Sequence, residues 1–348
     1  MLFAALRDMQ WRKRRLVITI LSTGLIFGMT LVLTGLANGF RVEARQTIDS
    51  LGIDQFVVKT GAAGPFAGSI PFPEVDLARV ASEPGVEAAV PLGCVVTMMQ
   101  DGKSTRNVTA FGAPEHGPGM PHVPEGRAPS APDEVAVSST IGRHIGESLE
   151  VGAHVLRIVG LVPNSTAMAV PNIFLTTQGI QQMAYNGQPL ITSIGIKGSP
   201  RALPAGYQTF DRAGAVNELV RPLKVAVSSI SIVAVLLWIV AVLIVGSVVY
   251  LSALERLRDF AVFKAIGAPT RSILAGLALQ ALVIALVAAA VGVLLAQLLA
   301  PLFPMIVAVP VGAYLALPVV AIVIGLLASL LGLRRVVAVD PALAFGGP

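Results

Sequence analysis

Four long apolar stretches stand out in the alternation of hydrophobic and polar positions along the chain. One lies near the N-terminus, and the other three lie together in the C-terminal part. Each is about as long as the roughly 20 apolar residues that an α-helix needs to cross a bilayer. We therefore predict four membrane-spanning helices, at Leu16–Leu36, Val225–Leu251, Ile273–Ala300 and Tyr314–Leu333.

The long segment between the first two spans has a different pattern. Short runs rich in β-branched residues are separated by Gly, Pro, Asn and Asp. This pattern predicts strands joined by turns, with occasional short helices, and thus an α+β domain of mixed strands. We expect strands at 55–60, 86–90, 95–100, 107–111, 134–138, 154–162 and 191–196, helices at 74–82 and 176–185, a hairpin turn at 101–102 and a surface loop at 112–132.

Composition supports an integral membrane protein. Hydrophobic residues make up 54% of the 348 residues and charged residues only 13%, whereas soluble domains have about 45–50% and about 25%. The net charge of +5 could suggest a nucleic-acid partner. However, the excess Lys and Arg residues flank the apolar spans, as the positive-inside bias predicts, so no nucleic acid is expected.

The distribution of Lys and Arg also predicts the topology. Basic residues cluster before the first span, in the loop after the second and after the fourth, whereas the connection 301–313 has none. Both termini and the 254–272 loop are therefore expected in the cytoplasm of a plasma-membrane protein. The first span exceeds a signal-peptide core in length and is predicted to stay as an anchor. The expected order is cytoplasmic 1–15, helix 16–39, extracytoplasmic domain 40–222, helix 223–253, cytoplasmic 254–272, helix 273–300, external loop 301–313, helix 314–333 and cytoplasmic tail 334–348.

The spans are poor in polar groups and contain pairs of glycines. They hold no Asp, Glu, Lys, Arg or His, which disfavours an ion-coupled transporter. Gly24 with Gly28, and Gly35 with Gly39, have the G-x-x-x-G spacing that lets helix backbones approach closely, so these four residues are predicted to pack helices. The chain has no G-x-x-x-x-G-K-[ST] phosphate loop, so an ATP-driven function would require another subunit's ATPase.

The external domain shows no recognisable catalytic chemistry. Its four histidines lack metal-ligand spacing, and no nucleophile motif is present. We interpret the pair Asp133 and Glu134 as a solvated turn. Cys94 is the only cysteine, so an intrachain disulfide is excluded. No catalytic, cofactor-binding or metal-binding residue is predicted, and the domain is expected to bind a partner or ligand.

The cytoplasmic loop between the second and third spans has an amphipathic pattern. On a helix beginning near Leu254, apolar residues recur at three- and four-residue spacing. Gly267 and Pro269 would then end that helix before the next span. Such a helix could lie on lipid headgroups, but its small, smooth apolar face favours docking into a cleft of a cytosolic protein.

Three motifs carry a family resemblance. They are L-E-R-L-R-D-F-A-V-F-K-A-I-G-A at 254–268, R-x-x-x-x-D-P-A at 335–342, and G-R-x-P at 126–129 followed by D-E-V-x-V at 133–137. With the order of one span, a large external domain and three spans, they resemble the MacB/FtsX/LolCE-type permeases of ABC transporters, and in particular an actinobacterial, mycobacterial-type member. Asp259 stands where the family usually has Glu, which could alter the ATPase contact slightly.

The resemblance implies an external domain of the MacB periplasmic-core type and a non-catalytic permease subunit. It implies a homodimer, or a heterodimer with a sister permease, surrounded by membrane lipid and bound to two cytosolic ATPase subunits, which would hold ATP and Mg. It also implies that the 254–272 loop couples the two proteins. The expected coupling residues are Glu255, Arg256, Arg258, Asp259, Phe260, Lys264 and Gly267.

Several functions are compatible with this reading. The favoured one is a type VII (MacB/FtsX-like) transporter in which ATP hydrolysis moves the external domain (mechanotransmission) for export of an envelope substrate. The alternative is a mechanical regulator of a cell-wall hydrolase or another extracytoplasmic protein. An amino-acid (glutamine) transporter fits less well, since roughly half of the chain is predicted to lie outside the membrane. A receptor or scaffold without an ATPase is a fourth possibility.

Overall fold

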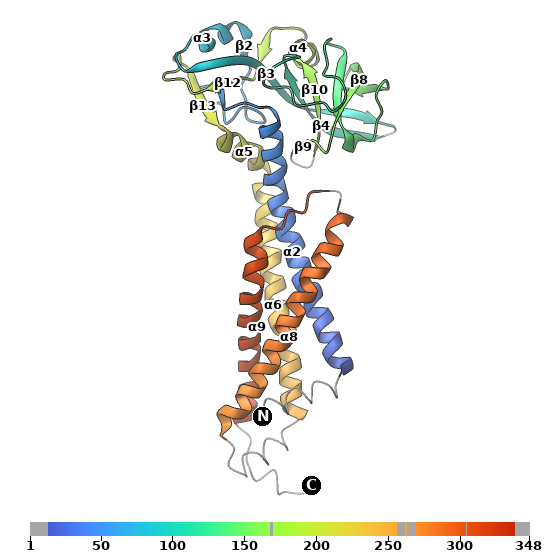
Figure 1. Cartoon of the computed structure of the whole chain (residues 1–348), viewed down its shortest axis with the longest axis vertical. Coiled ribbons are helices and arrows are strands. Elements are labelled where there is room, and N and C mark those ends of the chain that lie inside the picture. The colour runs from blue at the N-terminus through green and yellow to red at the C-terminus, as the bar shows by residue number, and fades with distance from the viewer. Residues whose placement is uncertain are drawn as a thin grey trace. The chain divides into compact units, whose positions relative to one another are not determined.

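The computed structural model describes residues 13–102, 104–167, 170–255, 262, 269–303 and 305–337. The chain divides into two compact units. One, here called the membrane unit, comprises the described residues of Met1–Gly39 and Ala226–Pro348; the other, the external unit, is Phe40–Val225. Figure 1 shows that the described part of the first unit is helical and that the second contains the strands that the structure describes.

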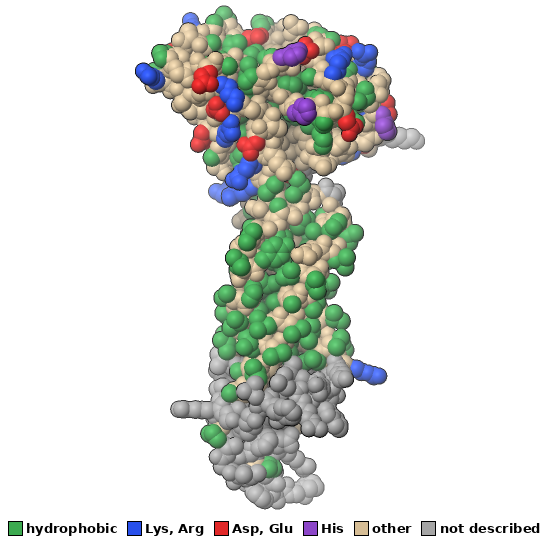
Figure 2. All heavy atoms as spheres, viewed as in Figure 1, with side chains coloured by type: hydrophobic (Ala, Val, Ile, Leu, Met, Phe, Trp, Pro, Cys, Tyr) green, Lys and Arg blue, Asp and Glu red, His purple; other side chains and the backbone are tan. Residues whose placement is uncertain are grey.

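In the part of the chain that the structure describes, the membrane unit is built from four long helices (Figure 1). Three stretches are long and apolar enough to cross a bilayer, at Leu16–Ser50, Arg212–Val248 and Ala278–Leu302, and Val311–Leu327 is a shorter apolar helix. Many hydrophobic side chains lie on the face of these helices that Figure 2 shows, and few charged side chains lie among them. The four helices are α2 (Lys13–Ser50), α6 (Lys224–Glu255), α8 (Thr270–Leu299) and α9 (Val311–Val337).

The core of the membrane unit is rich in alanine. Ala281, Ala285 and Ala288 of α8 are fully buried with Ala241 of α6 and Phe27 of α2. Small side chains let helix backbones approach closely, which compensates for the weak hydrophobic driving force between helices in lipid.

Helix α2 continues 11 residues beyond Gly39, the predicted end of the first span, and finishes at Ser50. The reason is local. Ala44 and Ile48 recur at four-residue spacing and are buried with Leu51 in a core of the external unit. An amphipathic helix with an apolar face to bury is stable outside the membrane as well.

The external unit contains one large mixed sheet. The strand order is β13-β1-β12-β3-β4-β10-β6-β8-β5, and β7 pairs with both β3 and β8. The pairings therefore close a ring of six strands, β3-β4-β10-β6-β8-β7. The strands are β1 (Gln55–Lys59), β2 (Phe72–Pro73), β3 (Val86–Asp101), β4 (Ser104–Ala113), β5 (Glu125–Gly126), β6 (Glu134–Ser138), β7 (Ser148–Val151), β8 (His154–Val162), β9 (Thr166–Ala167), β10 (Val170–Thr176), β11 (Leu190–Ile191), β12 (Ser193–Gly198) and β13 (Tyr207–Asp211).

Three short α-helices and four 3-10 turns complete the described fold. Thr176 caps α4 and Asp211 caps α5, each accepting a hydrogen bond from a glycine N–H three residues later. The helices are α3 (Leu77–Ala81), α4 (Thr177–Tyr185) and α5 (Arg212–Val220), and the 3-10 turns are η1 (Glu74–Asp76), η2 (Ser139–Ile141), η3 (Arg221–Leu223) and η4 (Ala300–Leu302).

The closed ring surrounds an apolar interior. Met99, Val108, Leu149, Ile158 and Ile173, which come from five of its strands, are buried together. The N-terminal half of β3 extends beyond the ring and pairs with β12 instead. The 16-residue strand β3 thus joins the ring to the second half of the sheet.

The structure corrects several boundaries expected from the sequence. The strands expected at 86–90 and 95–100 are one strand, because Pro91 lies where β3 pairs only with β12 and its missing N–H breaks no ladder bond. The helix expected at 74–82 consists of η1 and α3, and the loop expected at 112–132 contains β5. Strands β7, β10 and β13 and helix α5 were not expected. The partners of β10 and β13 are distant in sequence, whereas β7 forms a hairpin with β8, the next strand along the chain.

Candidate functional site

The predicted coupling segment lies largely outside the described residues. Glu255 is the last residue of α6, and α8 begins at Thr270 with Pro269, in an extended conformation, as its N-cap. The other predicted coupling residues, Arg256, Arg258, Asp259, Phe260, Lys264 and Gly267, are outside the part of the chain that the structure describes. Their role in coupling stays a prediction.

The first pair of predicted packing glycines faces α8. A Cβ atom at Gly24 would lie 2.8 Å from Val291 Cγ1 and 3.1 Å from the Ala288 carbonyl oxygen. A Cβ at Gly28 would lie 3.0 Å from the carbonyl oxygen of Gly292. Gly292 is itself restricted, since its Cβ would lie 2.6 Å from Phe27 Cβ. Glycines on both helices thus permit close backbone contact between α2 and α8.

The second pair faces the connection between α8 and α9. A Cβ at Gly35 would lie 2.7 Å from Val307 Cγ1 and 2.8 Å from Val309 Cγ2, and a Cβ at Gly39 would overlap the carbonyl oxygen of Ile306. The four glycines therefore serve two different contacts of the same helix.

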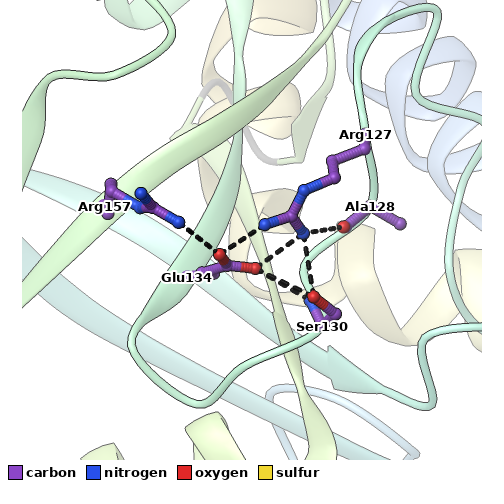
Figure 3. A network of polar contacts seen from close by, with 5 residues as sticks. All are labelled: Arg127, Ala128, Ser130, Glu134 and Arg157. Atoms are coloured by element: carbon purple, nitrogen blue, oxygen red, sulfur yellow. Dashed lines mark hydrogen bonds and ion pairs between the residues drawn. The ribbon is translucent and has the colours of Figure 1, made fainter.

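Figure 3 shows a polar network of the external unit that is centred on a nearly buried carboxylate. Glu134, on β6, is only 5% exposed, and its Oε1 accepts hydrogen bonds from Arg127 Nη2 at 2.5 Å and Arg157 Nη2 at 2.7 Å. Its Oε2 accepts from Arg127 Nη1 at 2.7 Å and from the backbone N–H of Ser130 at 3.1 Å. Figure 3 shows both guanidinium groups pointing at this carboxylate from opposite sides.

These contacts determine the chemistry of Glu134. The hydrogen bonds from Arg127, and then those from Arg157 and Ser130, outweigh the effect of burial and hold the pKa of the carboxyl well below its usual range. The interpretation of Glu134 as part of a solvated turn is therefore wrong. The strand at 134–138 was expected from the sequence, but the burial of all five of its residues, Glu134 included, was not. The network links the loop that follows β5 to β6 and β8. Because the Glu134 carboxyl group is ionised, it cannot act as a proton donor.

A shallow, open groove of about 580 Å³ lies on the external unit. It is mostly apolar and is formed by residues near α3, β2 and β3, including Pro73, Val75, Leu77 and Ala89. Val75 is 77% exposed. An apolar depression of this size falls within the range of small-molecule sites, about 300–1,000 Å³, although its openness would leave a ligand partly in water.

The described residues offer no metal centre. No group of three or more His, Cys, Asp and Glu side chains is close enough to hold a metal ion in that part of the chain. The Cys94 thiol is buried, and burial raises its pKa, which disfavours the reactive thiolate. His144 lies 3.1 Å from Glu147, an exposed pair typical of a surface ion pair.

Comparison with known sequences places this architecture in a family. Residues 231–341 match the FtsX-like permease C-terminal region, and residues 16–207 match the MacB-like periplasmic core domain. Two uncharacterized ABC transporter permeases of Mycobacterium tuberculosis strain H37Rv are 82% and 73% identical to this chain, and each alignment covers 100% of both chains. A permease of Mycobacterium bovis is also 73% identical over 100% of both chains.

Solved structures show weaker similarity, confined to part of the chain. The periplasmic region of MacB from Actinobacillus actinomycetemcomitans is 12% identical, with a TM-score of 0.35, covering 47% of this chain and 91% of that one. The extracellular domain of the transporter YknZ from Gram-positive bacteria is 12% identical, with a TM-score of 0.33, covering 46% and 99%. The sequence relatives, rather than these structures, establish the family.

The chain is thus a multi-pass inner-membrane protein with an extracytoplasmic domain. It belongs to the ABC transporter permeases that combine a MacB-like periplasmic core domain with an FtsX-like C-terminal region.

Proposed function

We propose that this permease couples ATP hydrolysis by a separate cytosolic ATPase to movement of its external domain, for export of an envelope substrate. The observation that carries the proposal is full-length identity of 82% to a protein named as an ABC transporter permease. A permease needs an ATPase, and this sequence has no phosphate-binding loop of its own. ATP and Mg would therefore be bound by the partner, and the chain itself would be non-catalytic.

The arrangement of the external unit supports a role outside the membrane. Its 186 residues, Phe40–Val225, form a mixed sheet with its own cores. The predicted spans contain no Asp, Glu, Lys, Arg or His to line an ion pathway. A mechanism in which the outer domain changes shape, rather than one in which a solute crosses between the spans, fits both facts. The assembly is proposed to be a dimer of permeases with two ATPase subunits.

The apolar groove near α3 favours export over regulation. It offers Val75, Leu77 and Ala89 as contacts for an apolar or amphipathic compound.

A different observation favours the second candidate, a regulator of a cell-wall hydrolase or another envelope protein. Val96 and Met98, two residues apart on β3 of the closed ring, are 48% and 57% exposed, and apolar side chains exposed next to one another can contribute to a protein-docking surface.

The first test is purification of the tagged full-length chain in mild detergent, with identification of the co-purifying proteins by mass spectrometry. A stoichiometric ATPase is expected, and Phe260→Ala or Gly267→Pro should uncouple hydrolysis from function without preventing membrane insertion. Gly312→Ala is a suitable control, since a Cβ there meets nothing within 4 Å. A chain that purifies without an ATPase, under conditions that preserve a known permease–ATPase complex, would refute the proposal.

A further inference from the structure

Ala308, in the connection between α8 and α9, makes two hydrogen bonds to α2. The Ala308 backbone N–H donates a hydrogen bond to the Gly35 carbonyl oxygen at 3.0 Å. The Ala308 carbonyl oxygen accepts one from Asn38 Nδ2 at 2.9 Å. Both peptide groups of one loop residue are therefore paired with the same helix. We call Met305–Pro310 the strap.

The fit of the strap against α2 depends on two glycines. Any side chain at Gly39 would overlap the Ile306 carbonyl oxygen, and a Cβ at Gly35 would press on both Val307 and Val309. Backbone cannot move aside as a flexible side chain can. Glycine inside a helix costs about 1 kcal/mol relative to alanine, and here its presence has a packing reason, because it lets the strap backbone reach α2.

The contact between the strap and α2 differs in kind from the contact that α2 makes with α8 around Gly24 and Gly28. Around Gly24 and Gly28 the helices meet through small side chains and backbone. Contacts of that type permit packed helices to slide by small amounts. Hydrogen bonds are directional, and weaken steeply when donor and acceptor move out of line. The pair at Ala308 therefore fixes the position of the strap along the α2 axis.

We propose that the strap transmits displacement of α8 and α9 to α2, and that Gly35, Asn38 and Gly39 are coupling residues in addition to those of the cytoplasmic loop. This inference rests on the proposed function. Helix α8 begins at Thr270, three residues after Gly267, the last of the predicted coupling residues. Helix α2 runs on to Ser50, within the external unit. Movement of α8 and α9 that starts at the cytoplasmic side would thus reach the external unit through the strap and α2. This route is additional to the direct one through α6.

The test compares the parent complex with Asn38→Ala and Gly39→Ala, each co-purified with its ATPase. Hydrogen–deuterium exchange of residues 40–222 is measured with and without ATP. We expect the ATP-dependent change in exchange to fall by more than half in both variants, while ATPase binding persists. Gly312→Ala, which adds the same methyl group in open space, should behave as the parent does.

A disulfide provides a second, independent variant if Gly39→Ala fails to fold. A Cβ at Gly35 would lie 2.7 Å from Val307 Cγ1, so Gly35→Cys with Val307→Cys places two Cβ atoms close to the roughly 3.5–4.5 Å that a disulfide needs. The native Cys94 is buried and would not compete. Oxidation of this pair in the Asn38→Ala background should restore the ATP-dependent change.

The outcomes separate the two proposals. A parent complex without any ATP-dependent change in the external unit overturns the proposed function, and the role of the strap with it. A change that is normal in the parent and persists in both Asn38→Ala and Gly39→Ala overturns the strap alone. Failure of oxidation to restore the change in the Asn38→Ala background would also overturn it, because a strap that transmits displacement should work once a disulfide attaches it to α2.

Discussion

Glu134 places an almost buried carboxylate between two partly exposed guanidinium groups. The side chains of Arg127 and Arg157 are 49% and 61% exposed, so they are solvated on one side and paired on the other. This arrangement avoids most of the desolvation cost of a fully buried ion pair. The carboxylate, on β6, accepts hydrogen bonds from β8 and from the 127–130 loop and therefore holds that loop against the ring.

Replacement of Glu134 by Gln should destabilise the external unit by about 1–3 kcal/mol at pH 7, since hydrogen bonds to a charged group are lost. The folded-state pKa of Glu134 is lowered. Its contribution is therefore present above the unfolded pKa of about 4.3 and is lost as the pH falls through the folded pKa.

Thermal unfolding of the full-length protein in detergent, from pH 7 to pH 3, checks this prediction. The difference in Tm between the parent and Glu134→Gln should shrink toward low pH. Glu87→Gln changes an exposed carboxylate and should have little effect at any pH. Equal Tm values for the parent and Glu134→Gln at pH 7 would show that the network contributes nothing to stability.

At the scale of elements, helix α4 packs on the sheet through glycine. A Cβ at Gly93 or at Gly112 would overlap Ile180 of α4, which is fully buried. Gly112→Ala should therefore force α4 away from the sheet and cost about 1–3 kcal/mol, as overpacking of cores usually does.

A double-mutant cycle with Ile180→Ala measures this contact by urea unfolding. Ile180→Ala alone should destabilise by leaving a cavity. In that background Gly112→Ala should cost clearly less than in the parent, because the methyl group enters the space that Ile180 vacated. Additive effects of the two substitutions would mean that Gly112 and Ile180 do not compete for space.

The contact between α2 and α8 leads to a similar prediction for the membrane unit. Gly292→Ala places a methyl group 2.6 Å from Phe27 Cβ and 3.0 Å from the Gly24 carbonyl oxygen, so the two helices must separate. Phe27 lies 5.4 Å from Trp238, measured between ring centroids. The substitution should therefore lower the Tm and shift the Trp238 emission.

Tryptophan fluorescence during thermal unfolding measures both effects. The chain has two tryptophans, and Trp11→Phe would leave Trp238 as the sole reporter. Gly312→Ala is the matched control in α9: it adds a methyl group in open space and should be neutral or slightly stabilising. If Gly292→Ala matched this control, close approach of α2 and α8 would be unnecessary.

At the scale of the whole molecule, the proposed export function predicts a change in what cells retain. A deletion strain should accumulate one or more apolar or amphipathic compounds relative to the parent strain, and the complemented strain should not. Comparison of cell and medium extracts by mass spectrometry measures this. Altered septa or cell-wall turnover with unchanged extracts would instead support the regulatory function.

The sequence by itself determined the class of the protein. A helix that crosses lipid must satisfy its own backbone and expose apolar side chains, so the four apolar stretches and the flanking Lys and Arg residues predict both spans and topology. The motifs at 126–137, 254–268 and 335–342 identified the family. Strands such as 134–138 and 154–162 were also predictable, because their boundaries depend on local turn residues.

Only the tertiary structure decided which distant residues meet. The sequence spacing of Gly35 and Gly39 matches that of Gly24 and Gly28, yet one pair faces a loop and the other a helix. Glu134 is a charged residue, and no local pattern shows that it is buried. Its burial depends on pairing with Arg157, which lies 23 residues away on a parallel strand. The composition of a segment determines whether it lies in lipid, in water or in a core. Which other segment it contacts depends on how the whole chain packs.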